Sequence, residues 1–207
     1  MIIDIAVDAE VVTIVRPVSA VVAPVRVIGR ESRMDGPLMS AAEQRRVSPD
    51  RADVTAAVRT MYKRVGLDPT RNRPSSEALL RRVRKGDALP RVNSLVDVIN
   101  WCSLESQLPF GLYDTAAVDG AVTLRLGRDN EAYQGIGKDD VHVAGRLVLV
   151  DAAGAFGNPT SDSRRTMVTE ATRSALVVIF APAELSQRVA EAALALTATR
   201  IAEYCSD

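Results

Sequence analysis

The chain has 207 residues and no net charge at pH 7, and it is 47% hydrophobic and 25% charged. Such values are typical of a globular chain that buries roughly 70% of its unfolded surface, and they exclude a disordered protein. The longest apolar stretch, at 175–183, is too short to span a bilayer, and the first twelve residues lack the basic region of a secretory signal. We therefore expect a cytoplasmic protein with no membrane association.

The neutral total conceals an uneven distribution of charge. Between residues 45 and 91 there are thirteen Arg or Lys residues but five Asp or Glu residues. This asymmetry favours a basic face that contacts a phosphate-bearing partner. It is equally typical of helix faces that are merely solvated, and the sequence leaves both interpretations open.

The N-terminal quarter of the chain predicts short strands followed by a linker. Residues 2–29 alternate apolar and polar residues around Pro17 and Pro24, which indicates two or three strands, some of them at sheet edges. Residues 30–49 are rich in Met, Gly, Pro and Ser and predict a linker with one helical turn. We assign residues 1–49 to the same domain as the core, which we place at 50–207.

The next region predicts helices. Apolar residues recur at helical spacing over 51–65, and Gly66 ends that helix. A second helix runs to Lys85, with Ser75 or Ser76 as its cap.

A third helix begins at Ser94, the predicted cap, with Asp97 in a box-like position. Beside its apolar stripe, this helix carries a second row of neutral polar residues, Asn100, Ser103 and Gln107. The row either lines a pocket or forms a solvated face.

The second half of the chain changes from a helical period to a strand period. Strand-like runs occupy 121–126, 132–137, 145–151 and 175–181, and an amphipathic helix covers 184–204. Helices, then strands, then a helix is the order of an α+β fold.

Standard catalytic signatures are missing from the sequence. His142 is the single histidine and forms no triad, and neither a phosphate loop nor a zinc spacing is present. Cys102 and Cys205 are expected to be free thiols. We expect neither a metal nor a cofactor.

The segment GNPTSDSRRT, residues 157–166, concentrates neutral hydrogen-bonding groups just before an apolar strand. One interpretation is a turn in which Asn, Ser and Thr side chains satisfy backbone groups. The other is a pocket wall that holds a water molecule and a substrate.

Four motifs in this order carry a resemblance to a known family: RPSSEALLRRV, LVDVIN, LPFGLYD and NPTSDSRRT. Together they make most of residues 50–200 resemble the tRNA-editing B3/B4 domain of the phenylalanyl-tRNA synthetase beta subunit, and more closely the freestanding proteins built from that domain. The resemblance implies a single α+β domain, with helices packed on a mostly antiparallel sheet. It also implies a trans-acting deacylase that hydrolyses the ester of a mischarged tRNA. In one branch of the family, the amino acid removed from the tRNA is the arginine analogue canavanine.

The resemblance places Asn100 in the editing pocket. It also shows two departures, because Gly111 stands where the synthetase has a histidine and Val178 stands approximately where it has a glutamate, so the substrate is expected to differ from tyrosine. An aminoacyl ester is already activated, so neutral groups that position water and stabilise an oxyanion can suffice.

The residues expected to form the site fall into three sets. The predicted catalytic residues are Asn100, Thr160 and Ser161. The predicted substrate-binding residues are Asn93, Ser103, Tyr113, Asp114, Asp162 and Ser163, with Asp114 and Asp162 as partners for a cationic amino acid. The predicted tRNA-binding residues are Arg71, Arg73, Arg81, Arg82, Arg84, Lys85 and Arg91. Two other functions remain open: a noncatalytic tRNA-binding module associated with a synthetase, and a hydrolase or sensor of free amino acids.

Overall fold

The structure is a computed structural model that describes residues 3–137 and 139–206. Its helices are α1 (Asp35–Val47), α2 (Ala52–Arg64), α3 (Ser75–Arg84), α4 (Ser94–Ser106) and α5 (Gln187–Tyr204), with short 3-10 turns at Ser32–Met34 and Thr115–Ala117. Its strands are β1 (Ile5–Val7), β2 (Val15–Val22), β3 (Phe110–Asp114), β4 (Val122–Leu126), β5 (Ala132–Gln134), β6 (Asp140–His142), β7 (Leu147–Asp151), β8 (Gly154–Gly157) and β9 (Ala175–Pro182).

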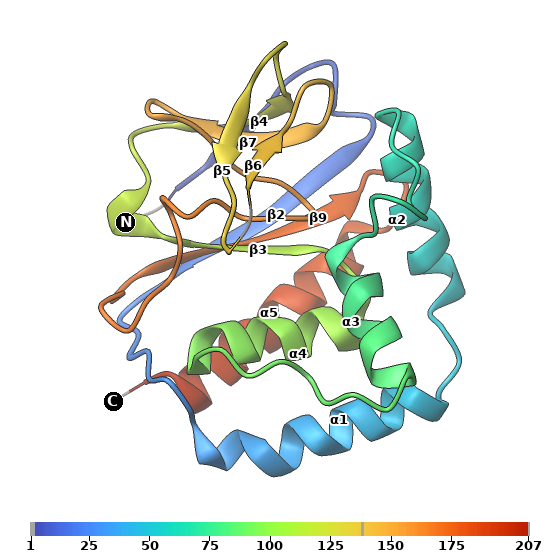
Figure 1. Cartoon of the computed structure of the whole chain (residues 1–207), viewed down its shortest axis with the longest axis vertical. Coiled ribbons are helices and arrows are strands. Elements are labelled where there is room, and N and C mark those ends of the chain that lie inside the picture. The colour runs from blue at the N-terminus through green and yellow to red at the C-terminus, as the bar shows by residue number, and fades with distance from the viewer. Residues whose placement is uncertain (1–2, 138, 207) are drawn as a thin grey trace.

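The strands form three sheets, in the orders β2-β9-β3, β1-β4-β7-β8 and β5-β6. Apart from the parallel pair β1–β4, the paired strands are antiparallel. Figure 1 shows α1, α3, α4 and α5 on one side of the three-stranded sheet, and β4 to β7 on its other side. The predicted α+β fold, with helices packed on a mostly antiparallel sheet, is therefore confirmed.

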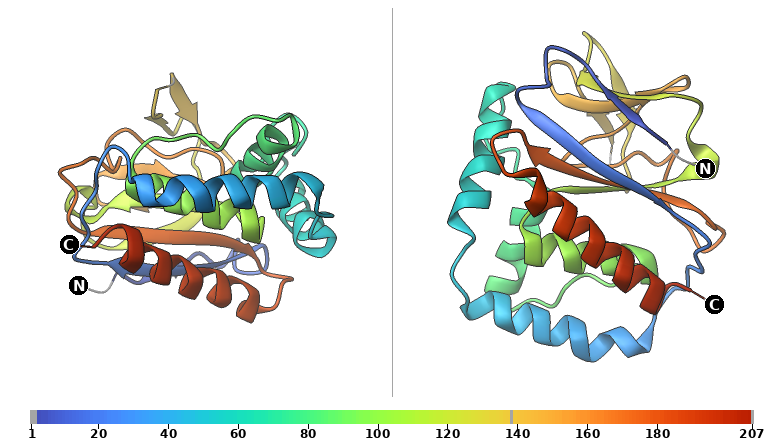
Figure 2. Two further views of the ribbon diagram at one scale, coloured as in Figure 1. Left: turned by 90° about the horizontal axis from the view of Figure 1, so that it is seen from below. Right: turned by 180° about the vertical axis from the view of Figure 1, so that it is seen from behind.

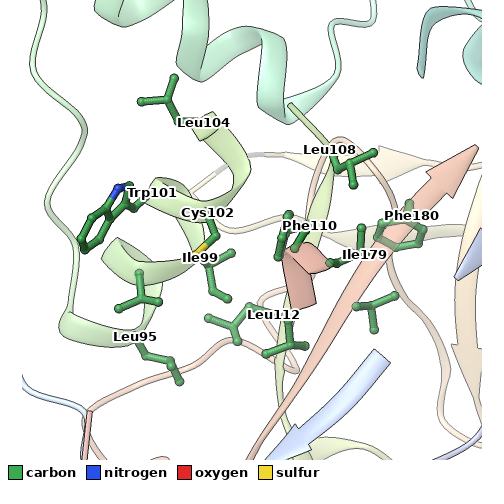
Figure 3. Close-up of a cluster of buried hydrophobic side chains, with 14 of the residues drawn as sticks. Leu95, Ile99, Trp101, Cys102, Leu104, Leu108, Phe110, Leu112, Ile179 and Phe180 are labelled. Atoms are coloured by element: carbon green, nitrogen blue, oxygen red, sulfur yellow. The ribbon is translucent and has the colours of Figure 1, made fainter. Parts of the chain in front are cut away.

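Strand β9 forms the centre of the core, and all eight of its residues are buried. It is flanked on both sides by other strands, so its sequence ALVVIFAP has no solvent-facing polar residue. Helix α5 packs on β2 and β9 and beside α4, as the rear view in Figure 2 shows. On β3, Phe110 and Leu112 point toward Ile99 and Leu95 of α4 (Figure 3).

Both N-terminal strands extend sheets formed by the later part of the chain. β1 pairs with β4, and β2 pairs with β9 at the edge of the three-stranded sheet. Pro17 lies within β2, where an edge position tolerates the missing N–H. Strands β1 and β2 are thus part of sheets formed by the later chain, and the division into 1–49 and 50–207 within one domain stays a prediction.

The expectation of a linker with a single helical turn over 30–49 is wrong. This region contains the 13-residue helix α1, which buries Leu38, Ala41 and Ala42 against α3 and α4. Its Gly36 and Pro37 lie in the first turn, where a proline costs no intrahelical hydrogen bond. Glycine and proline in the first turn of a helix therefore led to the wrong prediction of a linker.

Two predicted helix caps are displaced by one residue. The cap of α4 is Asn93, whose Oδ1 accepts a hydrogen bond from the Val96 N–H at 2.9 Å, and not Ser94. The Oγ of Ser94 instead accepts from the Ile28 N–H at 3.1 Å. Likewise α3 begins at Ser75 with Pro74 in the cap position, so neither predicted serine caps it.

The sequence analysis did not predict the strands β3, β6 and β8. β3 is buried at four of its five positions and so shows no alternation, β6 has three residues, and β8 is half glycine. Within the described part of the chain, no helix is long and apolar enough to cross a membrane.

Candidate functional site

The segment 157–166 docks along the edge of β3 that does not pair with β9. The Leu112 N–H donates to Oδ2 of Asp162 at 3.4 Å, and the Asp114 N–H donates to the Thr166 carbonyl at 2.9 Å. Within the segment itself, an isolated bridge joins Gly157 to Asp162. The polar segment thus covers an edge strand whose N–H groups would otherwise be buried without acceptors.

Several polar side chains of the segment form hydrogen bonds within the turn itself. Oδ1 of Asn158 accepts hydrogen bonds from the Thr160 and Ser161 N–H groups, at 2.8 and 2.9 Å. The hydroxyls of Ser163 and Thr166 bond to each other at 2.9 Å, and both residues are buried. For Asn158 and Ser163, turn formation therefore accounts for the polar side chain.

Three tyrosine hydroxyls from three different elements surround this turn. Tyr62 of α2 shares a hydrogen bond of 2.8 Å with the Thr160 hydroxyl, and the Tyr133 hydroxyl of β5 donates to the Ser161 carbonyl. Tyr113 of β3 is fully buried beside the Asp162 carboxylate. Tyr62 and Tyr133 thereby hold the turn by hydrogen bonds from two elements, and Tyr113 packs beside it.

All three tyrosines stay protonated well into the alkaline range. Burial raises the pKa of Tyr62, and burial together with the negative charge of Asp162 raises the pKa values of Tyr113 and Tyr133. None of the three phenol groups therefore serves as a base at neutral pH. The sequence analysis missed Tyr62 and Tyr133, because each looks like an ordinary residue on the buried face of its element.

Tyr113 fills a slot between two glycines. A Cβ atom added at Gly111 or at Gly157 would lie 2.2 Å from the Tyr113 hydroxyl oxygen, and Phe156 packs edge-on against the ring. Gly111 is also the direct cross-strand partner of Val178. The two departures from the family pattern therefore adjoin each other, and the chain's own tyrosine occupies the space beside Gly111.

A water-sized cavity lies next to the turn. It has a volume of about 20 Å³ and is lined by Tyr62, Val65, Leu67, Asn72, Arg146, Leu147, Asn158, Pro159 and Thr160. A single water molecule fits such a volume and finds hydrogen-bonding groups on the polar side chains of this lining. Thr160 is exposed, so the cavity adjoins the protein surface.

The other half of the predicted pocket lies on α4. Asn100 is half-buried there, and α4 packs on β3, the strand whose edge carries the turn. Ser103 is buried, and its hydroxyl donates to the Leu108 carbonyl at 2.8 Å. The cavity lining does not include Asn100 or Ser103. β3 is thus the shared neighbour of both halves, and their approach to one substrate stays a prediction.

Two further predicted substrate-binding residues have structural partners. The Asn93 side-chain oxygen is used in capping α4. The carboxylate of Asp114 accepts from the Ala116 N–H at 2.9 Å and from the Thr172 hydroxyl at 2.6 Å. Of the two acids expected to bind a cationic amino acid, Asp162 is the one that belongs to the turn at 157–166.

Four of the seven cations predicted to bind tRNA line one groove between α2 and α3. The groove has a volume of 350 Å³ and is lined by Asp50, Thr55, Arg59, Arg73, Glu77, Leu80, Arg81, Arg84 and Lys85. Its two acids are engaged: Glu77 by Nε and Nη2 of Arg59, at 2.8 Å each, and Asp50 by Arg84 at 2.9 Å.

Three cations of this groove remain unpaired. Among the residues that the structure describes, no carboxylate pairs with Arg73, Arg81 or Lys85. The groove therefore carries the excess positive charge that binds phosphate groups.

The three other predicted cations lie apart from this groove lining. Arg91 pairs with Asp97 at 2.6 Å and with Asp35, which fixes the loop before α4. Arg82 donates to the Ala88 carbonyl at 2.7 Å, and Arg71 lies 3.9 Å from Asp68. Arg91 in particular is a structural residue, because a half-buried guanidinium with two carboxylate partners has little capacity left for phosphate.

Among the described residues, there is no group of three or more His, Cys, Asp or Glu side chains that could hold a metal ion. His142 is exposed on β6. Cys102 and Cys205 are free and buried, as predicted, and burial raises the pKa of both thiols.

Comparison with known proteins supplies the family context. A family model described as "B3/4 domain" matches residues 57–205. Phenylalanine–tRNA ligase beta subunits from Brucella abortus and Brucella melitensis are 31% identical over 85 residues, which is 41% of this chain but 10% of theirs. An N-terminal fragment of the phenylalanyl-tRNA synthetase beta subunit from Pyrococcus horikoshii matches 98% of this chain and 49% of its own, with a TM-score of 0.51. At 14% identity this last likeness shows the fold alone.

Proposed function

The chain belongs to the B3/4 domain family, whose model covers residues 57–205, and from this premise we propose that it is a trans-acting aminoacyl-tRNA deacylase. Its relatives are beta subunits of phenylalanine–tRNA ligases, which supports tRNA as the partner. The observation that carries the proposal is the water-sized cavity beside Thr160, whose hydroxyl is held by the buried Tyr62.

The cavity suits an ester hydrolysis that needs no strong base. A water molecule held between Thr160, Tyr62 and Asn158 attacks the ester carbonyl carbon, and the carbonyl π electrons move onto oxygen. The oxyanion then re-forms the carbonyl while the bond to the ribose oxygen breaks. The water loses one proton and the ribose oxygen gains one, so the products are a free amino acid and tRNA. Fixed neutral donors lower the barrier because they are already oriented toward the developing charge.

The groove between α2 and α3 would bind the tRNA backbone. Arg73 belongs to the loop that also contributes Asn72 to the cavity lining. The groove and the cavity thus share the connection between α2 and α3, which supports a tRNA end that reaches Thr160 while its phosphates contact α3. Asp162 is our candidate for selecting a cationic side chain such as that of canavanine, and Asn100 our candidate for a second contact to the ester.

The test is release of amino acid from a panel of purified, mischarged tRNAs, including arginyl- and canavanyl-tRNA. We expect the protein to accelerate hydrolysis of a subset of the panel, and Asn100→Ala to lower that rate without unfolding the chain. Equal cleavage of cationic and apolar aminoacyl-tRNAs would exclude the selective role of Asp162.

A noncatalytic tRNA-binding module is the second candidate function. It is favoured by the structural use of Asn158 and Ser163 within the turn, and by Tyr113, which fills the space beside Gly111. Binding of tRNA with no acceleration of ester hydrolysis on any member of the panel would select this function instead.

A further inference from the structure

Arg146 occupies a position that the sequence analysis did not single out. It precedes β7 on a tight connection, where its N–H donates to the Val143 carbonyl and its carbonyl accepts from the Gly127 N–H, both at 2.8 Å. Arg146 is half-buried, and it lines the water-sized cavity together with Asn158 and Thr160. The backbone anchoring holds the start of this side chain beside the turn.

The guanidinium of Arg146 is not neutralised by a neighbouring acid. Two other arginines of this half of the chain are paired: Arg125 of β4 with Glu131 at 2.8 Å, and Arg165 with Asp151 of β7 at 2.9 Å. Within residues 3–137 and 139–206, no carboxylate forms an ion pair with Arg146. The charge of Arg146 also reaches the Tyr133 hydroxyl, where it opposes the rise in pKa that burial and Asp162 cause.

An unpaired cation beside a partly enclosed polar cavity stabilises an anion strongly, because little solvent screens it. Neutral hydroxyls and amides supply the rest of the cavity's polar lining, so Arg146 is the full positive charge at this place. We infer that Arg146 is a catalytic residue that stabilises the oxyanion formed when water attacks the aminoacyl ester. This inference rests on the proposed function.

The first experiment measures single-turnover and steady-state cleavage by Arg146→Met and by the control Arg164→Met. Like Arg146, Arg164 has no acid partner among the described residues, but it is exposed and lines a different groove, beside Gln134 and Arg165. We expect Arg146→Met to lower kcat by about 100- to 1000-fold with little change in KM, since the oxyanion exists only in the transition state. The control should keep its activity, and added guanidinium should restore part of the lost rate in Arg146→Ala.

A second experiment does not depend on turnover. Calorimetry would compare binding of two adenosine 3′-aminoacyl analogues, a neutral amide and an anionic phosphonate that mimics the tetrahedral intermediate. The wild-type protein should prefer the phosphonate, and Arg146→Met should lose that preference while it binds the amide as before.

Unchanged preference for the phosphonate in Arg146→Met would overturn the inference. A wild-type protein that cleaves esters while Arg146→Met cleaves them equally fast would overturn it too, and would leave the deacylase proposal standing. Absence of cleavage by the wild type would instead contradict the deacylase proposal, and the phosphonate comparison would still decide whether Arg146 binds an anion.

Discussion

The turn at 157–166 and the groove between α2 and α3 differ in the charge and the freedom of their polar groups. The turn at 157–166 is held by buried tyrosine hydroxyls and by its own side-chain hydrogen bonds, so its polar groups have few accessible positions. The groove between α2 and α3 carries long, exposed cations such as Arg81 and Lys85. Rigid neutral groups suit the positioning of one water molecule, whereas mobile charges suit a backbone recognised through its phosphates. Each prediction below tests one side of this contrast.

Among the tests of this contrast between turn and groove, the largest effect is expected at Thr160. Thr160→Val keeps the shape of the side chain but removes the hydroxyl, so cleavage of the preferred mischarged tRNA should fall by about 10- to 1000-fold, on the scale of losing one preorganised donor. Single-turnover deacylation measures this loss. Because the substitution also leaves the Tyr62 hydroxyl without its partner, the double variant Tyr62→Phe, Thr160→Val separates stability from chemistry. A rate within twofold of wild type would remove Thr160 from the mechanism.

Charge reversal in the groove should weaken tRNA binding without altering the chemistry. The variant Arg81→Glu, Lys85→Glu should lose about 10- to 100-fold in affinity, and the log–log slope against salt should shrink by about 1.5, because each phosphate contact contributes about 0.7 to 0.9. The matched control Arg128→Glu, Arg188→Glu changes the net charge equally at exposed sites outside the groove. Equal losses in both variants would show that binding follows net charge and not this groove.

Gly111→Ala tests how tightly the turn side of the molecule is packed. The added Cβ would lie 2.2 Å from the Tyr113 hydroxyl oxygen, so we expect the free energy of unfolding to fall by about 1 to 3 kcal/mol. Urea denaturation measures this change. Gly36→Ala in α1, which has nothing within 4 Å of the added atom, is the control and should be neutral or stabilising. Equal stability of the two variants would contradict the close packing of Tyr113 between Gly111 and Gly157.

Stability should decline at alkaline pH on account of the buried tyrosines. Tyr62 and Tyr113 have folded-state pKa values above the ordinary 10.0, so their contribution is complete below pH 10 and is lost as pH rises above it, because the unfolded state releases these protons first. Above the unfolded-state pKa, each tyrosine lowers the free energy of unfolding by about 1.4 kcal/mol per pH unit. Thermal unfolding between pH 8 and pH 11 should therefore show a shallower decline for Tyr62→Phe than for wild type, and parallel curves would argue against its burial.

The smallest effect is expected at Asn93. Asn93→Ala removes the cap of α4 and should cost about 1 kcal/mol of stability, whereas Asn93→Ser should retain most of it. Chemical denaturation of the three proteins measures the difference. A KM for the mischarged tRNA that rises in both variants, with no loss of stability, would support the predicted substrate contact in place of the cap.

The sequence by itself determined the elements that depend on local pattern. Helical periodicity is a local property, so α2 and α3 were predicted close to their observed bounds, the start of α4 was predicted within one residue, and the apolar run of β9 was predicted as a strand. The run of positive charge also needed no structure. Helix α1 was missed, because its stability comes from the burial of Leu38 and the two alanines beside it and not from its own composition.

Only the tertiary structure decided which groups surround the turn. Tyr62 and Thr160 are 98 residues apart, and their hydrogen bond exists because α2 and the segment after β8 converge beside the core. The same holds for the Tyr113 ring between Gly111 and Gly157, and for Arg146 at the cavity. Such contacts follow from how sheets and helices pack over the whole chain, and no pattern of neighbouring residues encodes them.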